Sequence, residues 1–170
     1  MTAKELATLY DYGSWANGRL FDVLSRLPDD DFTRSVAGSY GSMRNTLVHM
    51  LSAEAGWLDR CGGPSRGPKL NGDDFPTLAS VTERWGLVER QMRDFLGALR
   101  DDDLDRRVEF VIAPGAAPHV MSIGEMLHHA AIHNVHHRGQ IALLLRMLGH
   151  VPGNFDLLFY YGEKAGASSA

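Results

Sequence analysis

The sequence lacks the features that mark exported and membrane-spanning proteins. Among its 170 residues there is a single cysteine, Cys61, so no disulfide can form within the chain. No run of about 18 apolar residues occurs, so we expect no transmembrane helix. The first six residues, Met-Thr-Ala-Lys-Glu-Leu, lack the basic and then apolar pattern of a signal peptide. These absences lead us to expect a protein of the reducing cytoplasm, without a membrane partner.

Motifs for several common functions are also missing. The formal net charge is −4 and no stripe of Lys and Arg offsets it, so we expect no nucleic-acid partner. There is no Gly-rich phosphate loop and no His-Glu-x-x-His motif, which excludes the usual zinc-protease helix. The composition, 44% hydrophobic and 22% charged, is that of one globular domain. We place this domain at residues 1–164 and expect residues 165–170 to form a disordered tail.

Apolar residues recur at helical spacing in four long segments. The first predicted helix covers residues 2–27 and ends before Pro28. The second begins after Ser42, a good N-cap, and ends before a pair of glycines. The third begins near residue 76 and carries a seam of apolar residues as far as Leu99.

The fourth long helix has the clearest start, because Ser122 and Glu125 form a capping box. It should continue to Gly149, a natural residue to follow a helix end. Before it, residues 108–121 show a period of two that indicates a small hairpin, and a short last helix is expected around residues 155–161. The predicted fold is therefore all-α: a four-helix bundle with crossover connections, a short C-terminal helix and a small hairpin before the fourth long helix.

Four of the eight histidines lie between residues 129 and 137, within this fourth helix. His133 and His137 are four residues apart, so they differ by about 40° around the helix axis and can point at one spot. Neutral imidazole is a common ligand of zinc and nickel, so the pair is a candidate metal site. The competing interpretation is that both are core residues whose ring nitrogens are hydrogen-bonded within the protein. Any ring nitrogen left without a partner there would lower stability by about 1–3 kcal/mol.

A third ligand should come from another helix. His49 lies among apolar residues in the second helix and is the obvious candidate, although a core histidine bonded to a backbone carbonyl fits the same pattern. His129 is also four residues from His133, so spacing allows His129 and His133 as an alternative pair of ligands. Glu54 is a candidate base or hydrogen-bond acceptor, but we favour an exposed helix glutamate. We interpret Cys61 as incidental rather than reactive, because few basic neighbours are available to lower its pKa.

Four stretches of the chain, taken in order, resemble the DinB/YfiT family. They are YGSWANGRL from Tyr12 to Leu20, SMRNTLVH from Ser42 to His49 followed by Glu54 and Trp57, HNVHHRGQ from His133 to Gln140, and the closing segment from Gly149 to Tyr160. The third is the most specific, because it matches the family's His-x-x-x-His-Arg-Gly-Gln signature.

This resemblance implies an up-down-down-up bundle that forms a homodimer, with one divalent metal, nickel or zinc, bound by His49, His133 and His137. Three protein nitrogens leave positions open for water or substrate, which is typical of catalytic sites. Relatives are similar to thiol-dependent S-transferases, so a low-molecular-weight thiol is an implied cofactor. We assign no catalytic residue. Arg138 is expected to pair with a carboxylate across the bundle, and Asp156 is one candidate.

Three functions compete. The leading hypothesis is a small metalloenzyme that performs thiol transfer or hydrolysis on a small-molecule substrate, with Trp57 and the loop over residues 62–75 at the mouth of its pocket. The second is a non-catalytic metal-binding or stress-response dimer in which the metal stabilises the bundle. The third treats the histidines as core residues of a helical dimerisation module.

Overall fold

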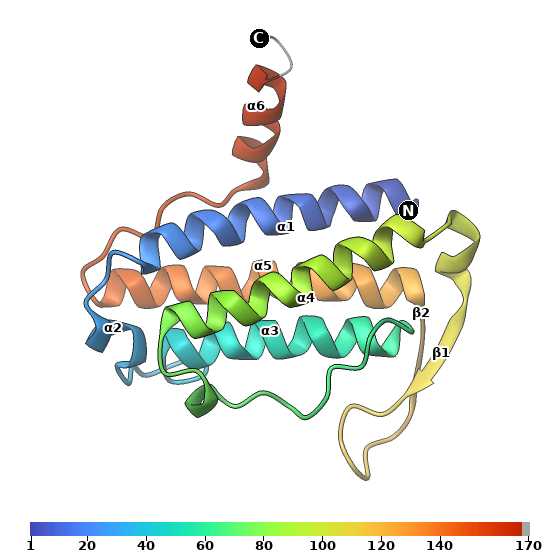
Figure 1. Ribbon diagram of the computed structural model, residues 1–170, viewed down its shortest axis with the longest axis horizontal. Coiled ribbons are helices and arrows are strands. Elements are labelled where there is room, and N and C mark those ends of the chain that lie inside the picture. The colour runs from blue at the N-terminus through green and yellow to red at the C-terminus, as the bar shows by residue number, and fades with distance from the viewer. Residues whose placement is uncertain (168–170) are drawn as a thin grey trace.

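Four long helices form the body of the protein, which we describe from a computed structural model over residues 1–167 (Figure 1). They are α1 (Ala3–Leu24), α3 (Met43–Arg60), α4 (Leu78–Ala98) and α5 (Ile123–Met147). Helices α1 and α3 each pack against both α4 and α5. In Figure 1, α1 and α5 run in one direction and α3 and α4 in the other. The up-down-down-up bundle is therefore confirmed.

The helix starts follow from side chains that cap them. Ser42, Thr77 and Ser122 each accept a hydrogen bond from the backbone N–H three residues later, as the sequence predicted for α3 and α5. The end of α1 was predicted too late. The helix stops at Leu24, because the N–H groups of Arg26 and Leu27 bond three residues back in a tighter turn.

Short elements connect the long helices. The small helix α2 (Asp29–Thr33), which the sequence did not predict, follows α1, and two 3₁₀ turns, η1 (Gly72–Asp74) and η2 (Asp101–Asp105), lie on either side of α4. The predicted hairpin is confirmed as the antiparallel pair β1 (Arg107–Phe110) and β2 (His119–Ser122). It leads directly into α5, so it fixes the position where the histidine-bearing helix begins.

The interior is filled by large apolar side chains from all four long helices. Trp85, Leu47, Leu51 and Ile141 are buried in one cluster, and a second cluster forms around Met92 near the hairpin. Close packing of this kind has low compressibility, so it holds the helices in place. The bundle can therefore hold side chains from α3 and α5 at fixed separations.

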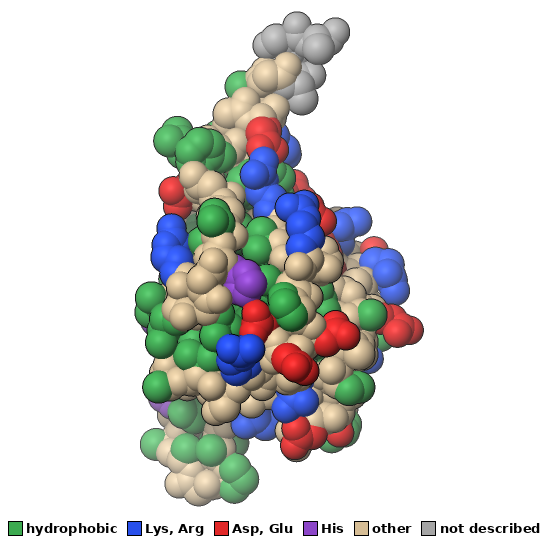
Figure 2. Space-filling model, turned by 90° about the vertical axis from the view of Figure 1, so that its left-hand side faces the viewer, with side chains coloured by type: hydrophobic (Ala, Val, Ile, Leu, Met, Phe, Trp, Pro, Cys, Tyr) green, Lys and Arg blue, Asp and Glu red, His purple; other side chains and the backbone are tan. Residues whose placement is uncertain are grey.

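The last helix, α6 (Leu157–Ala167), projects away from α1. This helix is longer than predicted, because residues 165–167 are helical although the sequence placed them in the disordered tail. The rest of the predicted tail, residues 168–170, lies outside the described part of the chain. Contacts with α1 stabilise the longer helix, since Trp15 Nε1 donates to Glu163 Oε2 at 2.8 Å and Arg19 pairs with the same carboxylate. Figure 2 shows hydrophobic side chains on the projecting segment. Within residues 1–167, no helix is long and apolar enough to cross a membrane.

Candidate metal centre

Three histidines from two helices converge on one point. His49 comes from α3, and His133 and His137 come from α5. The Nε2 atom of His133 lies 3.1 Å from Nε2 of His49 and 3.1 Å from Nε2 of His137. The structure thus brings together the three histidines that the sequence singled out, in a group that could hold a metal ion.

The two distances of 3.1 Å are close to what a small divalent ion requires, and all three ligand atoms lie within 4.8 Å of one another. In a tetrahedral zinc site with Zn–N bonds of about 2.0–2.1 Å, two ligand nitrogens lie about 3.3 Å apart. The helical spacing of His133 and His137 supplies two nitrogens, and the packing of α3 on α5 supplies the third. Little movement of the side chains is therefore needed to fit an ion.

Hydrogen bonding leaves the Nε2 atom of His137 available as a ligand. Its Nδ1 lies 2.7 Å from the Gln140 side-chain oxygen, which can only accept, so the ring proton is on Nδ1. The same oxygen accepts from the Ser39 hydroxyl at 2.7 Å. The Gln140 side-chain nitrogen lies 3.0 Å from Nε2 of His136. Gln140 thus fixes the orientation of His137, as hydrogen-bond partners do for metal-ligating histidines.

Electrostatics keeps the three imidazoles neutral. Burial lowers the pKa of His49 to about 4, with His137 and Lys69 adding to the effect. Burial also lowers the pKa of His133 to about 4, helped by the neighbouring histidines, and lowers the pKa of His137 against the opposing effect of Gln140. Neutral imidazole is the form that binds a metal.

One atom of the group is left without a partner. Nδ1 of His133 is buried and has no hydrogen bond within residues 1–167. If the proton of this neutral ring lies on Nε2, it can be donated to Nε2 of His137, and Nδ1 is an acceptor without a partner. If the proton lies on Nδ1, the Nε2 lone pairs of His133 and His137 face each other. A cation held by the Nε2 atoms would remove that repulsion, so the donor set fits a metal.

Tyr40 belongs to the site although the sequence did not indicate it. Its ring stacks on His49 with centroids 3.9 Å apart, and its hydroxyl lies 3.0 Å from His49 Nε2. The turn that places it has positive φ at Gly38, Ser39 and Gly41. Only the glycines could have marked such a turn in the sequence, since no periodic pattern identifies Tyr40.

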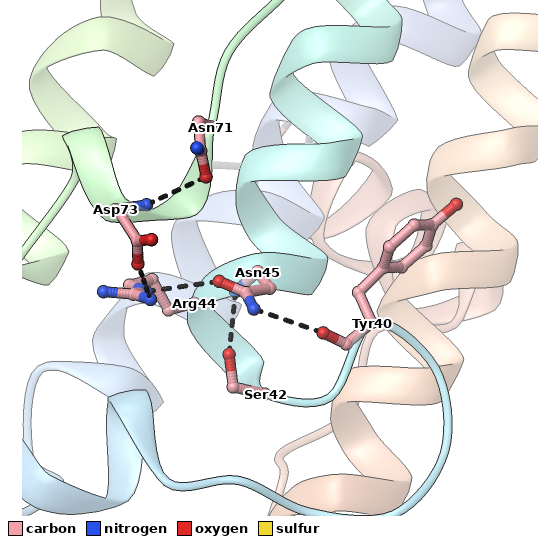
Figure 3. Close-up of polar contacts among 6 residues, drawn as sticks. All are labelled: Tyr40, Ser42, Arg44, Asn45, Asn71 and Asp73. Atoms are coloured by element: carbon pink, nitrogen blue, oxygen red, sulfur yellow. Dashed lines mark hydrogen bonds and ion pairs between the residues drawn. The ribbon is translucent and has the colours of Figure 1, made fainter.

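Polar contacts tie this turn to α3 and to η1 (Figure 3). The Asn45 side chain donates to the Tyr40 carbonyl at 3.3 Å, and its backbone N–H donates to the Ser42 hydroxyl at 3.0 Å. Arg44 donates to Asn45 and pairs with Asp73 at 2.7 Å. The network fixes the position of Tyr40 beside the histidines.

A groove of about 470 Å³ opens beside His49. Tyr40 and Asn45 line it, together with residues 69–72 from the predicted mouth loop. Trp57, the other residue predicted at the mouth, does not line this groove. Its ring instead packs against Phe110 and His129.

A second polar cluster lies in the bundle interior, and here several predictions were wrong. Glu54 is buried rather than exposed and accepts from the Asn134 side chain at 2.5 Å. Within residues 1–167, Arg138 forms no ion pair with a carboxylate, Asp156 included. It donates to the buried Asn17 side chain at 2.9 Å and lies over the Tyr12 ring. Desolvation raises the pKa of Glu54 to about 7.

The other singled-out side chains lie outside the three-histidine group. His129 is exposed, with its ring centroid 5.8 Å from that of His133, so the alternative 129/133 pair is not the one that the structure brings together with His49. His128 and His136 are exposed, as expected from their positions on α5. Cys61 is buried, and burial raises the pKa of its thiol to about 12, which agrees with the interpretation of an incidental cysteine.

The fold and the site together define a helical bundle with a candidate three-histidine metal centre. The chain belongs to the DinB family, whose model matches residues 1–165. It is similar to Protein DinB of Bacillus subtilis (strain 168), with 22% identity over 156 residues that cover 89% of this chain and 91% of the relative. It is also similar to the uncharacterized protein YizA of the same organism, with 23% identity over 139 residues, 82% of this chain and 85% of that one.

Solved structures show the same fold. A DinB-like protein from Bacillus cereus ATCC 10987 matches with a TM-score of 0.72 and 20% identity, over 90% of this chain and 97% of its own. A conserved protein from Enterococcus faecalis matches with a TM-score of 0.58 and 13% identity, over 86% of this chain and 96% of its own.

Proposed function

We propose that His49, His133 and His137 bind one divalent ion, nickel or zinc, and that the protein is a metal-dependent enzyme acting on a small molecule. The observation that carries this proposal is the convergence of three Nε2 atoms, one of them on a histidine, His49, that lines an open groove. When bound, the ion would act as a Lewis acid toward a thiol or an electrophile. Thiol transfer and hydrolysis are the two reactions that this site supports, with a low-molecular-weight thiol as co-substrate in the first.

The surroundings of the histidines suit a catalytic site. Three protein ligands leave coordination positions open, and one of the ligands, His49, lines the groove. The Tyr40 hydroxyl, 3.0 Å from His49 Nε2, is near enough to donate a hydrogen bond to a bound substrate. Lys69 and Asn71 line the groove and offer donors for a polar substrate. Tyr40 therefore serves as a positioning or proton-donating residue in this proposal.

A panel of electrophiles tests the reaction. Zinc- or nickel-loaded protein is mixed with a small thiol and chlorodinitrobenzene for transfer, or with p-nitrophenyl acetate for hydrolysis. We expect turnover in the parent, loss in His133→Ala, and unchanged turnover in His128→Ala, a matched exposed histidine of the same helix. Tyr40→Phe should lower turnover without removing the metal. Turnover that survives in metal-free His133→Ala would contradict the proposal.

The second candidate is a metal-binding protein without catalysis, in which the ion holds α3 to α5. The position of the three ligands on these two helices favours some stabilisation in either case. A structural role predicts a large fall in melting temperature on chelation and no turnover with any member of the panel. The open groove beside His49 favours the catalytic role, because structural sites are closed.

Exposed apolar side chains support a homodimer. Ile132, Leu143 and Met147 on α5 are more than half exposed, and Leu158 on α6 is 75% exposed. Exposed apolar surface of this kind is typical of protein–protein contacts. Analytical ultracentrifugation should show a dimer in the parent and a shift toward monomer in Leu143→Glu; a monomeric parent would exclude it. The cytoplasmic location stays a prediction.

A further inference from the structure

A cavity of about 200 Å³ lies between α1 and α4 and reaches the interior of the bundle. None of the three histidines lines it, so it is distinct from the candidate metal centre. Its walls are mostly apolar and include the buried side chains of Trp85, Met92 and Leu96. An engineered apolar cavity of about 150 Å³ is known to hold benzene, so this one is large enough for a one-ring ligand.

The inner end of the cavity carries hydrogen-bond acceptors. Glu54 and Asn134 line it, and both are buried. Asn134 donates its amide nitrogen to Glu54 Oε2, which leaves its own oxygen, Oδ1, buried and without a partner within residues 1–167. An unsatisfied buried acceptor is unfavourable by about 1–3 kcal/mol. A ligand with N–H donors would satisfy this group.

Glu54 is the acidic residue of the cavity that a positively charged ligand could neutralise. Of the other two acidic residues that line it, Asp11 pairs with Lys164 at 3.9 Å and Glu89 pairs with Arg93 at 3.6 Å. Arg138 also lines the cavity, but its side chain donates to Asn17 and lies over the Tyr12 ring. The buried Glu54 carboxyl has a hydrogen bond from Asn134 but no direct ion pair in the described residues. Its negative form would therefore be stabilised by a positively charged ligand.

We propose that this cavity binds a small primary amine with an apolar body, the ammonium group toward Glu54 and Asn134 and the body against Trp85 and Met92. An ammonium group carries three donors and no acceptor, which matches the acceptors at the inner end. This site does not depend on the metal proposed above, so either proposal can fail without the other.

Glycines at the rim give a way to block the cavity without disturbing its floor. Gly13 lines it, and a Cβ added there would meet no atom within 4 Å. A leucine at this position therefore has room to extend over the opening. Gly18 on the same helix is equally unobstructed but does not line the cavity. Gly13→Leu and Gly18→Leu are thus a matched pair, both with the higher helix propensity of leucine.

Calorimetric titration with phenethylamine tests the site, with phenethyl alcohol as the uncharged probe of the same size. We expect binding of one phenethylamine per chain, at least about tenfold weaker binding of the alcohol, and at least tenfold loss in Gly13→Leu and Asn134→Leu. Gly18→Leu should bind like the parent. His133→Ala should do so too, because the amine does not bind through a metal. Circular dichroism verifies that each variant is folded.

Four results would overturn the proposal. Equal binding of amine and alcohol would show an apolar cavity without recognition of an ammonium group. Unchanged binding in Gly13→Leu would place the ligand elsewhere, and loss in His133→Ala would place it on the metal centre. Absence of binding heat with phenethylamine, together with a crystal structure showing water against Asn134, would show that solvent occupies the cavity.

Discussion

Replacing Glu54 with Gln should remove a pH dependence that this buried carboxyl gives to folding. The side chain lies inside the bundle, and burial raises its pKa from 4.5 to about 7 against the opposing hydrogen bond from Asn134. In the unfolded chain the carboxyl loses its proton near pH 4.5, whereas in the folded chain it keeps the proton until about pH 7. Between these values the folded protein binds more protons than the unfolded chain.

The size of the effect follows from the two pKa values. One pKa unit corresponds to about 1.4 kcal/mol, so the contribution of Glu54 to the unfolding free energy falls by about 3 kcal/mol as the pH rises through this range. The stabilisation is complete below pH 4.5 and lost above pH 7. Since a domain is stable by about 5–15 kcal/mol, this loss is readily measurable. Gln cannot ionise and can still accept from Asn134.

Urea unfolding of metal-free protein from about pH 5 to about pH 8 measures this directly. The unfolding free energy of Glu54→Gln minus that of the parent should rise with pH by about 2–3 kcal/mol. Other groups, including the histidines, are common to both proteins and cancel. Glu83→Gln, an exposed position on α4, is the control and should show no such trend. A difference that stays constant across the range would refute the claim that Glu54 is buried and hard to ionise.

Three further outcomes follow from the structure. Arg138→Met should lower the unfolding free energy by about 2–3 kcal/mol in urea titrations, because it leaves the Asn17 oxygen buried without its donor; a loss below about 0.5 kcal/mol would count against this contact. Cys61 should resist alkylation by iodoacetamide in the folded protein and react in urea, since burial raises the pKa of its thiol to about 12; rapid reaction under native conditions would show an exposed thiol. Zinc at about one hundred times its Kd should stabilise the parent by about 2.7 kcal/mol, which corresponds to a rise in melting temperature of roughly 5–10 °C. It should have no effect on His49→Ala. An equal rise in this variant would place the ion elsewhere.

The fold could be predicted because its signals are local. The N-caps Ser42 and Ser122 and the apolar stripes of the four helices act within a few residues, so their effect is visible in the sequence. The missed length of α6 depends on contacts with another helix. Residues 165–167 join α6 through packing of this helix on α1, where Trp15 and Glu163 meet.

The candidate site was predicted in part for the same reason. The spacing of His133 and His137 is a property of one helix, and His49 was the single histidine of the first 118 residues. The burial of Glu54 was missed because it depends on Asn134 of α5, which no spacing within α3 reveals. Tyr40 was missed because a turn with positive φ, rather than a regular element, places it on His49.

Metal content of untagged protein tests the central claim most directly. Elemental analysis should find about one equivalent of nickel or zinc in the parent and in His128→Ala, and almost none in His49→Ala and His133→Ala. That result would show one ion shared between α3 and α5. No metal in the parent after growth with added nickel or zinc, or equal metal in all four proteins, would contradict the account.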